Sequence, residues 1–107
     1  MDVRPLHTLL DDISALIGDL FLSGFSSVND SVLSGMKRLG SSCRDYGLDY
    51  PCRMLSQLEK LIEAQRHSGQ RHDEEICSVL CGLNRYAALC RRQVEIDMAK
   101  QDLLGEE

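Results

Sequence analysis

The sequence contains no tryptophan, and aromatic residues make up only 5% of its 107 positions. Sites that bind sugars or unpaired bases depend on exposed rings, so this scarcity counts against both kinds of ligand. The formal net charge of −5 counts against nucleic acid as well, because a phosphate backbone attracts basic surfaces. We therefore expect no nucleic-acid partner.

An export signal and a long apolar run are also missing. The N-terminal residues MDVRPLH contain no basic segment followed by an apolar one. The most apolar stretch, ISALIGDLFL, is too short to span a bilayer and contains Asp19. We therefore expect a cytoplasmic protein with no membrane partner, and its five cysteines are expected to be reduced thiols.

Signals for β-strands are absent, which leaves helices as the expected secondary structure. No segment alternates polar and apolar residues, and no Asn-Gly or Asp-Gly pair joins two β-branched segments. The only prolines, Pro5 and Pro51, both lie where a helix could begin, since proline is tolerated in a first helical turn. The pattern predicts an all-α protein.

Four segments carry apolar residues at the spacing of an amphipathic helix. We predict helices over residues 5–23, 27–46, 51–67 and 73–100. Gly24, Gly47 and Gly69 follow three of these segments, as glycine commonly does at a helix end. The connections are short enough to make consecutive helices antiparallel, so we predict a four-helix bundle with up-down-up-down order. Residues 1–100 would form this single domain, and residues 101–107 a flexible acidic tail.

Local signals at the helix ends refine these boundaries. Ser27 begins the segment SVND, which resembles a capping box, and Asp73 is placed to cap the last predicted helix. Gly35 and Gly40 lie inside the second predicted helix, where each costs about 1 kcal/mol relative to alanine. They mark either a close contact with a neighbour or a weak middle.

The last predicted helix has an unusually wide apolar face and is expected to be the helix around which the others pack. One stripe consists of Ile76, Leu80, Leu83, Ala87, Cys90 and Val94. A second, adjoining stripe consists of Val79, Gly82, Tyr86 and Leu89. If the other helices leave the second stripe uncovered, it forms a surface for a partner protein or a second copy of the chain. Burial of that stripe within the bundle is the alternative.

A metal site is the other arrangement that the spacing suggests. Cys77 and Cys81 are four residues apart and share a helix face, and His72 lies just before them. A structural zinc takes about four ligands, and the third and fourth are not evident, although His67 also lies in the preceding loop. We therefore expect no metal or other cofactor, and we interpret most of the thiols as small buried hydrophobic groups. Cys52, at the start of the third predicted helix, is expected to be the most exposed and reactive.

No catalytic constellation is visible. Asp11 and Asp12 are adjacent and point to different sides of a helix, and no Glu-x-x-His pair, phosphate-binding loop or nucleophile elbow occurs. Asn84 could fix the register of the last helix by a hydrogen bond at the edge of the core, or contact a ligand. We expect no enzymatic activity.

Three stretches follow one another along the chain: DLFLSGF, VLSGMKRLGSSCRDYGLDYPCRMLSQLEKLIEAQ and EEICSVLCGLNRYAALCRR. In this order they resemble the helical region that accompanies SWIM-type zinc finger proteins of bacteria, over nearly the whole chain. The matching positions are Leu20, Phe21, Gly24, Gly47, Leu48, Met54, Leu55, Leu58, Leu61 and Leu83. The zinc-binding motif, Cys-x-Cys followed by Cys-x-His, is absent, so neither zinc nor the role of that finger is carried over. The resemblance implies an accessory helical module of a bacterial protein.

Two functions are compatible with the sequence. The leading hypothesis is a small cytosolic helical module for protein–protein interaction, as a dimer or as an accessory part of a larger assembly. The alternative is a helical bundle that binds a metal or a ligand through Cys77, Cys81 and a nearby histidine.

Overall fold

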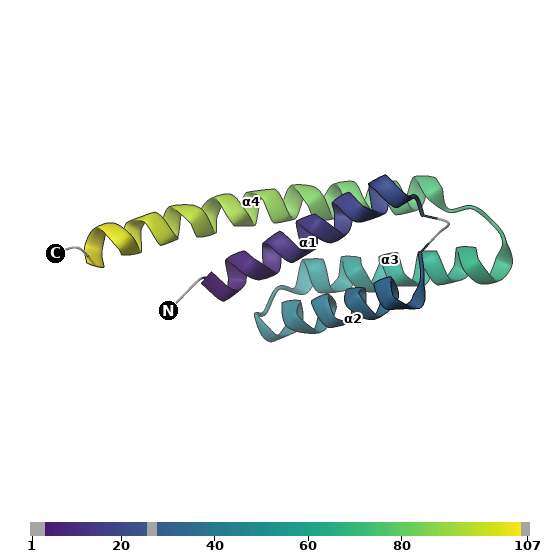
Figure 1. Ribbon diagram of the computed structural model, residues 1–107, viewed down its shortest axis with the longest axis horizontal. Helices are drawn as coiled ribbons and strands as arrows, with labels where there is room; N and C mark the ends of the chain where they lie inside the picture. Colours follow the sequence, from purple (N-terminus) through teal and green to yellow (C-terminus); the bar gives the residue numbers. More distant parts are fainter. Residues whose placement is uncertain (1–3, 26–27, 106–107) are drawn as a thin grey trace.

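The computed structural model describes residues 4–25 and 28–105. Its four helices are α1 (Arg4–Ser23), α2 (Asp30–Asp45), α3 (Asp49–Ser68) and α4 (Asp73–Gly105), and no strand occurs in these two ranges (Figure 1). Consecutive helices run in opposite directions, and α1 also packs against α4. The predicted all-α, up-down-up-down four-helix bundle is confirmed.

Three glycines end helices as the sequence indicates. Gly24, Gly47 and Gly69 have φ angles of 83°, 74° and 72°, which only glycine adopts without a steric cost. The amide of Gly69 donates a hydrogen bond to the carbonyl of Gln65 at 3.2 Å, which closes the last turn of α3.

The helix starts differ from prediction by a few residues. The N-cap of α2 is Asn29, whose side-chain oxygen accepts a hydrogen bond from the amide of Val32 at 3.0 Å. The predicted capping residue Ser27 lies outside the described residues. Helix α3 begins at Asp49, so Pro51 lies within the first turn, where a missing N–H group leaves no carbonyl unpaired.

The start of α4 corrects the predicted cap. The amide of Ile76 donates to the carbonyl of His72 at 2.9 Å, so His72 occupies the N-cap position and Asp73 is the first helical residue. The acidic first turn, Asp73, Glu74 and Glu75, still lies at the positive end of the helix dipole, where carboxylates are stabilised.

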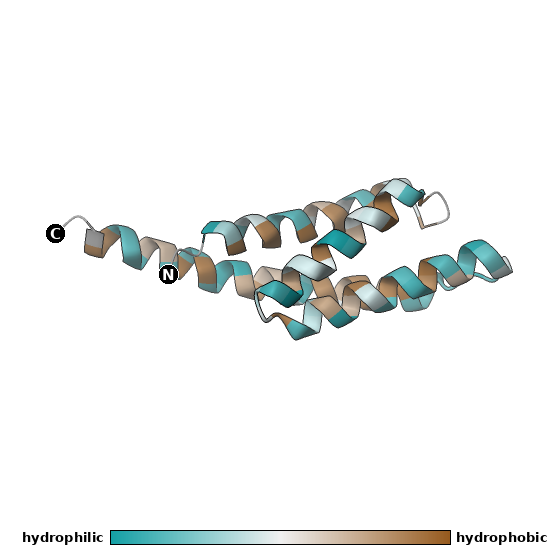
Figure 2. Cartoon of the chain, turned by 90° about the horizontal axis from the view of Figure 1, so that it is seen from below, coloured by the Kyte–Doolittle hydropathy of each residue, from teal (hydrophilic) through white to brown (hydrophobic). Residues whose placement is uncertain are grey.

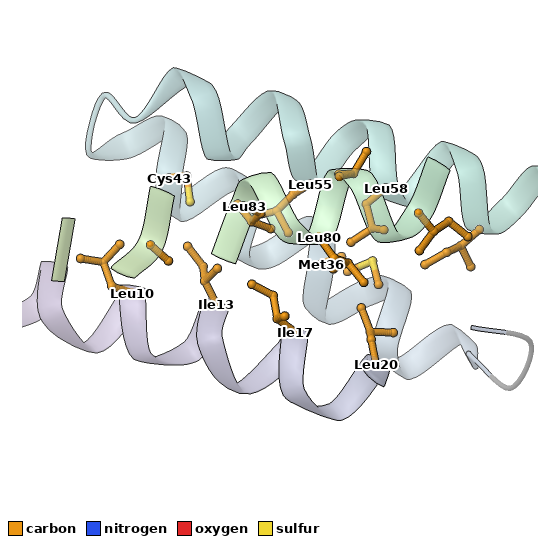
Figure 3. Packing of buried hydrophobic residues seen from close by; sticks show 14 of the residues in the cluster. Leu10, Ile13, Ile17, Leu20, Met36, Cys43, Leu55, Leu58, Leu80 and Leu83 are labelled. Carbon is orange, nitrogen blue, oxygen red and sulfur yellow. The ribbon is translucent and has the colours of Figure 1, made fainter. Parts of the chain in front are cut away.

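The core runs along the axis of the bundle and contains no buried polar side chain among the described residues. Each helix contributes aliphatic side chains that are almost completely buried, as Figure 3 shows for Leu10, Ile13, Met36, Leu55, Leu58, Leu80 and Leu83. The first apolar stripe predicted for α4 is part of this core: all its members are buried except Cys90, which is half-buried. Burial of a leucine or isoleucine side chain contributes about 1.5–3 kcal/mol, so this core is the main source of stability.

Helix α4 is much longer than its neighbours. It has 33 residues, which corresponds to about 50 Å of helix, and the whole molecule is 60 Å long. The boundary predicted at residue 100 is therefore wrong for residues 101–105, which continue the helix; Glu106 and Glu107 lie outside the described residues. Figures 1 and 2 show the C-terminal end of α4 projecting past the other three helices.

The middle of α2 is open rather than closely packed. A Cβ atom added to Gly35 or Gly40 would meet nothing within 4 Å. Of the two interpretations of these glycines, the structure supports a weak helix middle over a close contact.

Candidate functional site

The segment of α4 that extends beyond α3 carries four of the seven exposed large apolar side chains of the described residues. Tyr50, in the first turn of α3, packs its ring against Tyr86 with a centroid distance of 5.0 Å. Helix α3 therefore begins at the level of Tyr86. We call the following residues of α4, 88–105, the distal segment; α3 does not cover them (Figure 1).

Three large aliphatic side chains of the distal segment are exposed on one side of the helix. They are Leu89, Ile96 and Leu103, with exposed fractions of 64%, 43% and 68%. Their spacing of seven residues corresponds to two helical turns, so they form one line, which we call the distal stripe. Leu104, also largely exposed, lies beside its end.

The opposite side of the distal segment packs on α1. Val94 is buried there and Met98 is half-buried against the core. Burial on the α1 side and exposure along the distal stripe give this segment two apolar faces. Among the described residues, only the face toward α1 has a partner within the chain.

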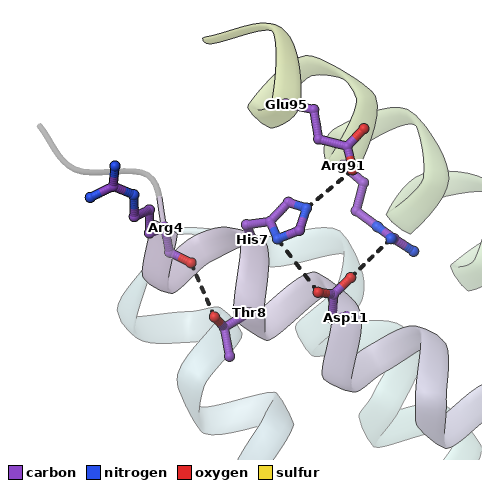
Figure 4. Close-up of polar contacts among 6 residues, drawn as sticks. All are labelled: Arg4, His7, Thr8, Asp11, Arg91 and Glu95. Carbon is purple, nitrogen blue, oxygen red and sulfur yellow. Dashed lines mark hydrogen bonds and ion pairs between the residues drawn. The ribbon is translucent and has the colours of Figure 1, made fainter. Parts of the chain in front are cut away.

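A chain of polar contacts fixes α1 to the distal segment (Figure 4). The imidazole of His7 lies between two carboxylates: its Nε2 is 3.1 Å from Glu95 Oε1 and its Nδ1 is 3.4 Å from Asp11 Oδ2. The other oxygen of Asp11 is 3.1 Å from the guanidinium of Arg91. These groups are partly exposed, so each pair contributes at most about 1 kcal/mol.

The first part of the second apolar stripe predicted for α4 is covered within the bundle, and its last residue is exposed. Val79 is 8% exposed and belongs to the core, and Gly82 faces the Tyr50 hydroxyl. Tyr86 is half-buried against the Tyr50 ring, whereas Leu89 points outward. Of these four residues, only Leu89 has a largely exposed side chain.

Sequence reasoning missed the continuation of this stripe at Ile96 and Leu103. The signal was present, because Gly82, Leu89, Ile96 and Leu103 recur every seven residues. Placing Leu103 in a flexible tail removed the last member of the repeat from consideration.

Two side chains near the start of α3 resist ionisation. Burial raises the pKa of the Cys43 thiol from 9.0 to about 11, with a smaller contribution from the neighbouring Cys52 thiol. Burial also raises the pKa of Tyr86 to about 12, and contact with the Cys90 thiol adds to this effect. Both groups are neutral at physiological pH, as expected for residues that pack rather than react.

The candidate metal ligands do not assemble into a site. Cys81 is exposed and Cys77 is half-buried, while His72 lies 3.7 Å from Glu75 Oε1. Over residues 4–25 and 28–105, no three His, Cys, Asp or Glu side chains are grouped so that they could hold a metal ion.

The predictions for Cys52 and Asn84 are wrong, as the exposure of the side chains shows. Cys52 is half-buried against the core, because α3 begins before Pro51 and Cys52 lies beside Cys43 and Arg44 of α2, whereas Cys81 is exposed. Asn84 is exposed, so it makes no buried hydrogen bond that could fix helix register.

A shallow groove of about 530 Å³ separates α1 from α2. Asp12 and Asp19 line it from α1, and Arg38 and Gly35 line it from α2. Small residues leave the two helices apart here, and mixed charge at the rim gives the groove no clear ligand preference.

Within the described part of the chain, no helix is both long enough and apolar enough to cross a membrane. No curated protein and no solved structure matches the chain. The family model of the YehQ four-helical bundle domain matches residues 7–101, which include most of all four helices and two of the three leucine and isoleucine positions of the distal stripe. The chain therefore belongs to the YehQ four-helical bundle domain family.

Proposed function

We propose that this domain is a helical protein-interaction module that acts through the distal stripe and carries out no catalysis of its own. The observation that supports the proposal is the alignment of Leu89, Ile96 and Leu103 on the uncovered side of α4. Single exposed apolar residues are common on soluble proteins and need no explanation. A line of three on one helix face is the pattern by which amphipathic helices recognise other helices.

The contacts between the distal segment and α1 support the same interpretation. Contacts of His7, Asp11 and Arg4 with Glu95, Arg91 and Asp102 hold the segment against α1 along most of its length. A surface that is already ordered loses less conformational entropy on binding than a flexible tail. The domain thus presents a preformed helix face, as an accessory module of a larger cytoplasmic assembly would.

Site-specific photo-crosslinking in cells tests this proposal. A benzophenone side chain at position 96 should give a covalent adduct with another polypeptide, because it lies at the centre of the distal stripe. The matched control is the same side chain at Gln57, an exposed polar position on α3. Absence of an adduct from position 96, or equal adducts from both positions, would contradict the proposal.

A further inference from the structure

We propose that Cys43 and Cys52 form a redox-active pair, in which Cys52 reacts with an anionic low-molecular-weight disulfide and Cys43 then closes a disulfide between α2 and α3. Both residues are free thiols in the structure. The pair belongs to α2 and α3 and is separate from the distal stripe on α4. Three observations support the proposal: the alignment of α2 with α3, the charges around Cys52, and the burial of Cys43.

Two ion pairs show how α2 and α3 are aligned. Asp30 Oδ1 lies 3.0 Å from the guanidinium of Arg66, and Lys37 Nζ lies 3.3 Å from Glu59 Oε1. From the first pair to the second, each helix advances by seven residues toward the connection between the helices. Seven residues correspond to about two helical turns, so the alignment repeats at this interval.

One further step of seven residues brings Arg44 opposite Cys52, and both residues line the same surface hollow. Cys43 precedes Arg44 on α2 and is fully buried, so it lies on the core side of Arg44. Hydrogen bonds also connect both cysteine backbones to one residue. The amide of Leu48 donates to the carbonyl of Cys43 at 2.8 Å, and the amide of Cys52 donates to the carbonyl of Leu48 at 3.3 Å. Cys52 therefore lies between the buried thiol and solvent.

The charges around Cys52 favour an anionic reagent. Cys52 is half-buried, and it lines a shallow hollow of about 550 Å³ together with Arg44, Arg53 and Asp49. Neither arginine has an ion-pair partner among residues 4–25 and 28–105. Two guanidinium groups against one carboxylate make the hollow positive, so it attracts a disulfide that carries carboxylates, such as oxidised glutathione.

The burial of Cys43 sets the order of the two steps. Burial raises the pKa of the Cys43 thiol to about 11, which keeps it protonated and unreactive toward reagents in solution. The Cys52 thiol adds to this shift, an electrostatic effect that weakens with distance and thus indicates that the two sulfur atoms are close. Oxidation therefore begins at Cys52, and Cys43 reacts only with its neighbour.

The reaction consists of two thiol–disulfide exchanges. The thiolate of Cys52 attacks one sulfur of the reagent, so a bond forms to Cys52 Sγ, the reagent's S–S bond breaks, and the departing thiolate takes up a proton. The Cys43 thiol then gives its proton to water and attacks Cys52 Sγ, and the second half of the reagent leaves as a thiolate that takes up a proton. Two protein thiols are oxidised to one disulfide, and the reagent is reduced to two thiols.

Peptide mapping after treatment with oxidised glutathione tests the proposal. The folded chain is incubated with the reagent, the remaining thiols are blocked with maleimide in urea, and the protein is digested with trypsin without reduction. Trypsin cleaves after Arg38, Arg44 and Arg53, which places the two cysteines in separate peptides, 39–44 and 45–53. We expect these peptides to be joined, with a mass about 2 Da below their sum because two hydrogens are lost.

Three variants separate the steps. Cys43→Ala should retain glutathione on Cys52, because no second thiol displaces it, and Cys52→Ser should leave Cys43 unmodified. With Arg44→Gln and Arg53→Gln together, Cys52 should react at least about threefold more slowly with oxidised glutathione. The rate with the uncharged reagent 2-hydroxyethyl disulfide should not change. Circular dichroism of each variant checks that the helices are intact.

Three results would each overturn the proposal. The first is a Cys52 that stays unmodified after the exposed Cys81 has reacted. The second is a glutathione adduct on Cys52 that persists in the wild-type chain as long as it does in Cys43→Ala. The third is an equal rate for wild type and the double arginine variant with oxidised glutathione. The joined peptide is measured on the wild-type chain, so it decides the first two questions even if a cysteine variant fails to fold.

Discussion

The hydroxyl oxygen of Tyr50 lies 2.8 Å from the point that a Cβ atom on Gly82 would occupy. This contact joins the first turn of α3 to α4 and marks the place where α4 stops being covered on that side. At Gly82 and Tyr86, this side of α4 is covered by Tyr50, whose ring lies 5.0 Å from the Tyr86 ring. From Leu89 toward the C-terminus, the same side is uncovered and forms the distal stripe.

The effect of Gly82→Ala on the free energy of unfolding should depend on whether the Tyr50 hydroxyl is present. In an open helix position, glycine to alanine stabilises by about 1 kcal/mol. Here the new methyl group must displace the Tyr50 hydroxyl, so we expect little or no gain in the free energy of unfolding. In a Tyr50→Phe background the obstacle is gone, and the gain should reappear. A double-mutant cycle by urea denaturation measures the coupling, expected at about 0.5 kcal/mol or more.

Gly40→Ala is the matched control for this cycle, because a Cβ atom at Gly40 meets nothing within 4 Å. It should stabilise the domain by up to about 1 kcal/mol whether residue 50 is tyrosine or phenylalanine. Equal effects of Gly82→Ala in both backgrounds would show that the Tyr50 hydroxyl imposes no constraint.

The five thiols should react in an order set by exposure. Cys81 is exposed, whereas Cys43 is fully buried. A maleimide reagent added to the folded protein should therefore modify Cys81 first, and Cys43 only when the domain unfolds. Mass spectrometry of digests over time gives the order. Modification of Cys43 at the rate of Cys81 would mean that the α2–α3 end of the core opens locally.

Stability should fall at alkaline pH because of Cys43. Its pKa is 9.0 when unfolded and about 11 in the folded domain. Below pH 9 the thiol is protonated in both states and contributes no pH dependence; above it the unfolded chain loses the proton first, so stability decreases with rising pH. Between about pH 8 and 10.5 this loss should reach about 2 kcal/mol.

Cys43→Ala isolates this contribution from other groups that titrate in the same range. Urea denaturation should show a smaller loss of stability between the two pH values in this variant than in wild type. An identical pH dependence in both proteins would show that Cys43 does not resist ionisation in the fold.

Arg91→Met tests the polar contacts between α1 and α4. The methionine retains most of the aliphatic stem but loses the ion pair to Asp11, which is 3.1 Å long and partly exposed. We expect a loss of less than about 1 kcal/mol, which shrinks further in high salt. Ile13→Ala, in the core below these contacts, should cost about 2–5 kcal/mol. A loss above about 2 kcal/mol for Arg91→Met would assign the contacts a far larger role than their exposure allows.

Much of the fold follows from local sequence patterns. Helix periodicity and the glycines at positions 24, 47 and 69 suffice to predict four antiparallel helices, because both signals act within a few residues. The first stripe of α4 was also predicted correctly, since a wide apolar face requires neighbours on more than one side.

The candidate surface was predicted less well, because exposure depends on where another helix begins. The sequence places Leu89 beside Tyr86 without indicating that α3 starts at the level of Tyr86. The contact of Tyr50 with Gly82 joins residues far apart in the chain, which no local pattern encodes. Likewise, Leu103 followed by glycine and glutamates is typical of a helix that has ended, whereas α4 continues to Gly105.

The central claim is that the distal stripe is an interaction surface for another polypeptide. Its most direct test compares photo-crosslinking in cells from a benzophenone side chain at position 89 in the otherwise wild-type protein and in Ile96→Glu, which places a charge at the centre of the stripe. Leu22→Glu is the control, since Leu22 is an exposed leucine on α1, outside the stripe. We expect the otherwise wild-type protein and Leu22→Glu to give the same adduct, while Ile96→Glu remains fully helical and loses it. Equal adducts from the otherwise wild-type protein and Ile96→Glu would contradict the account.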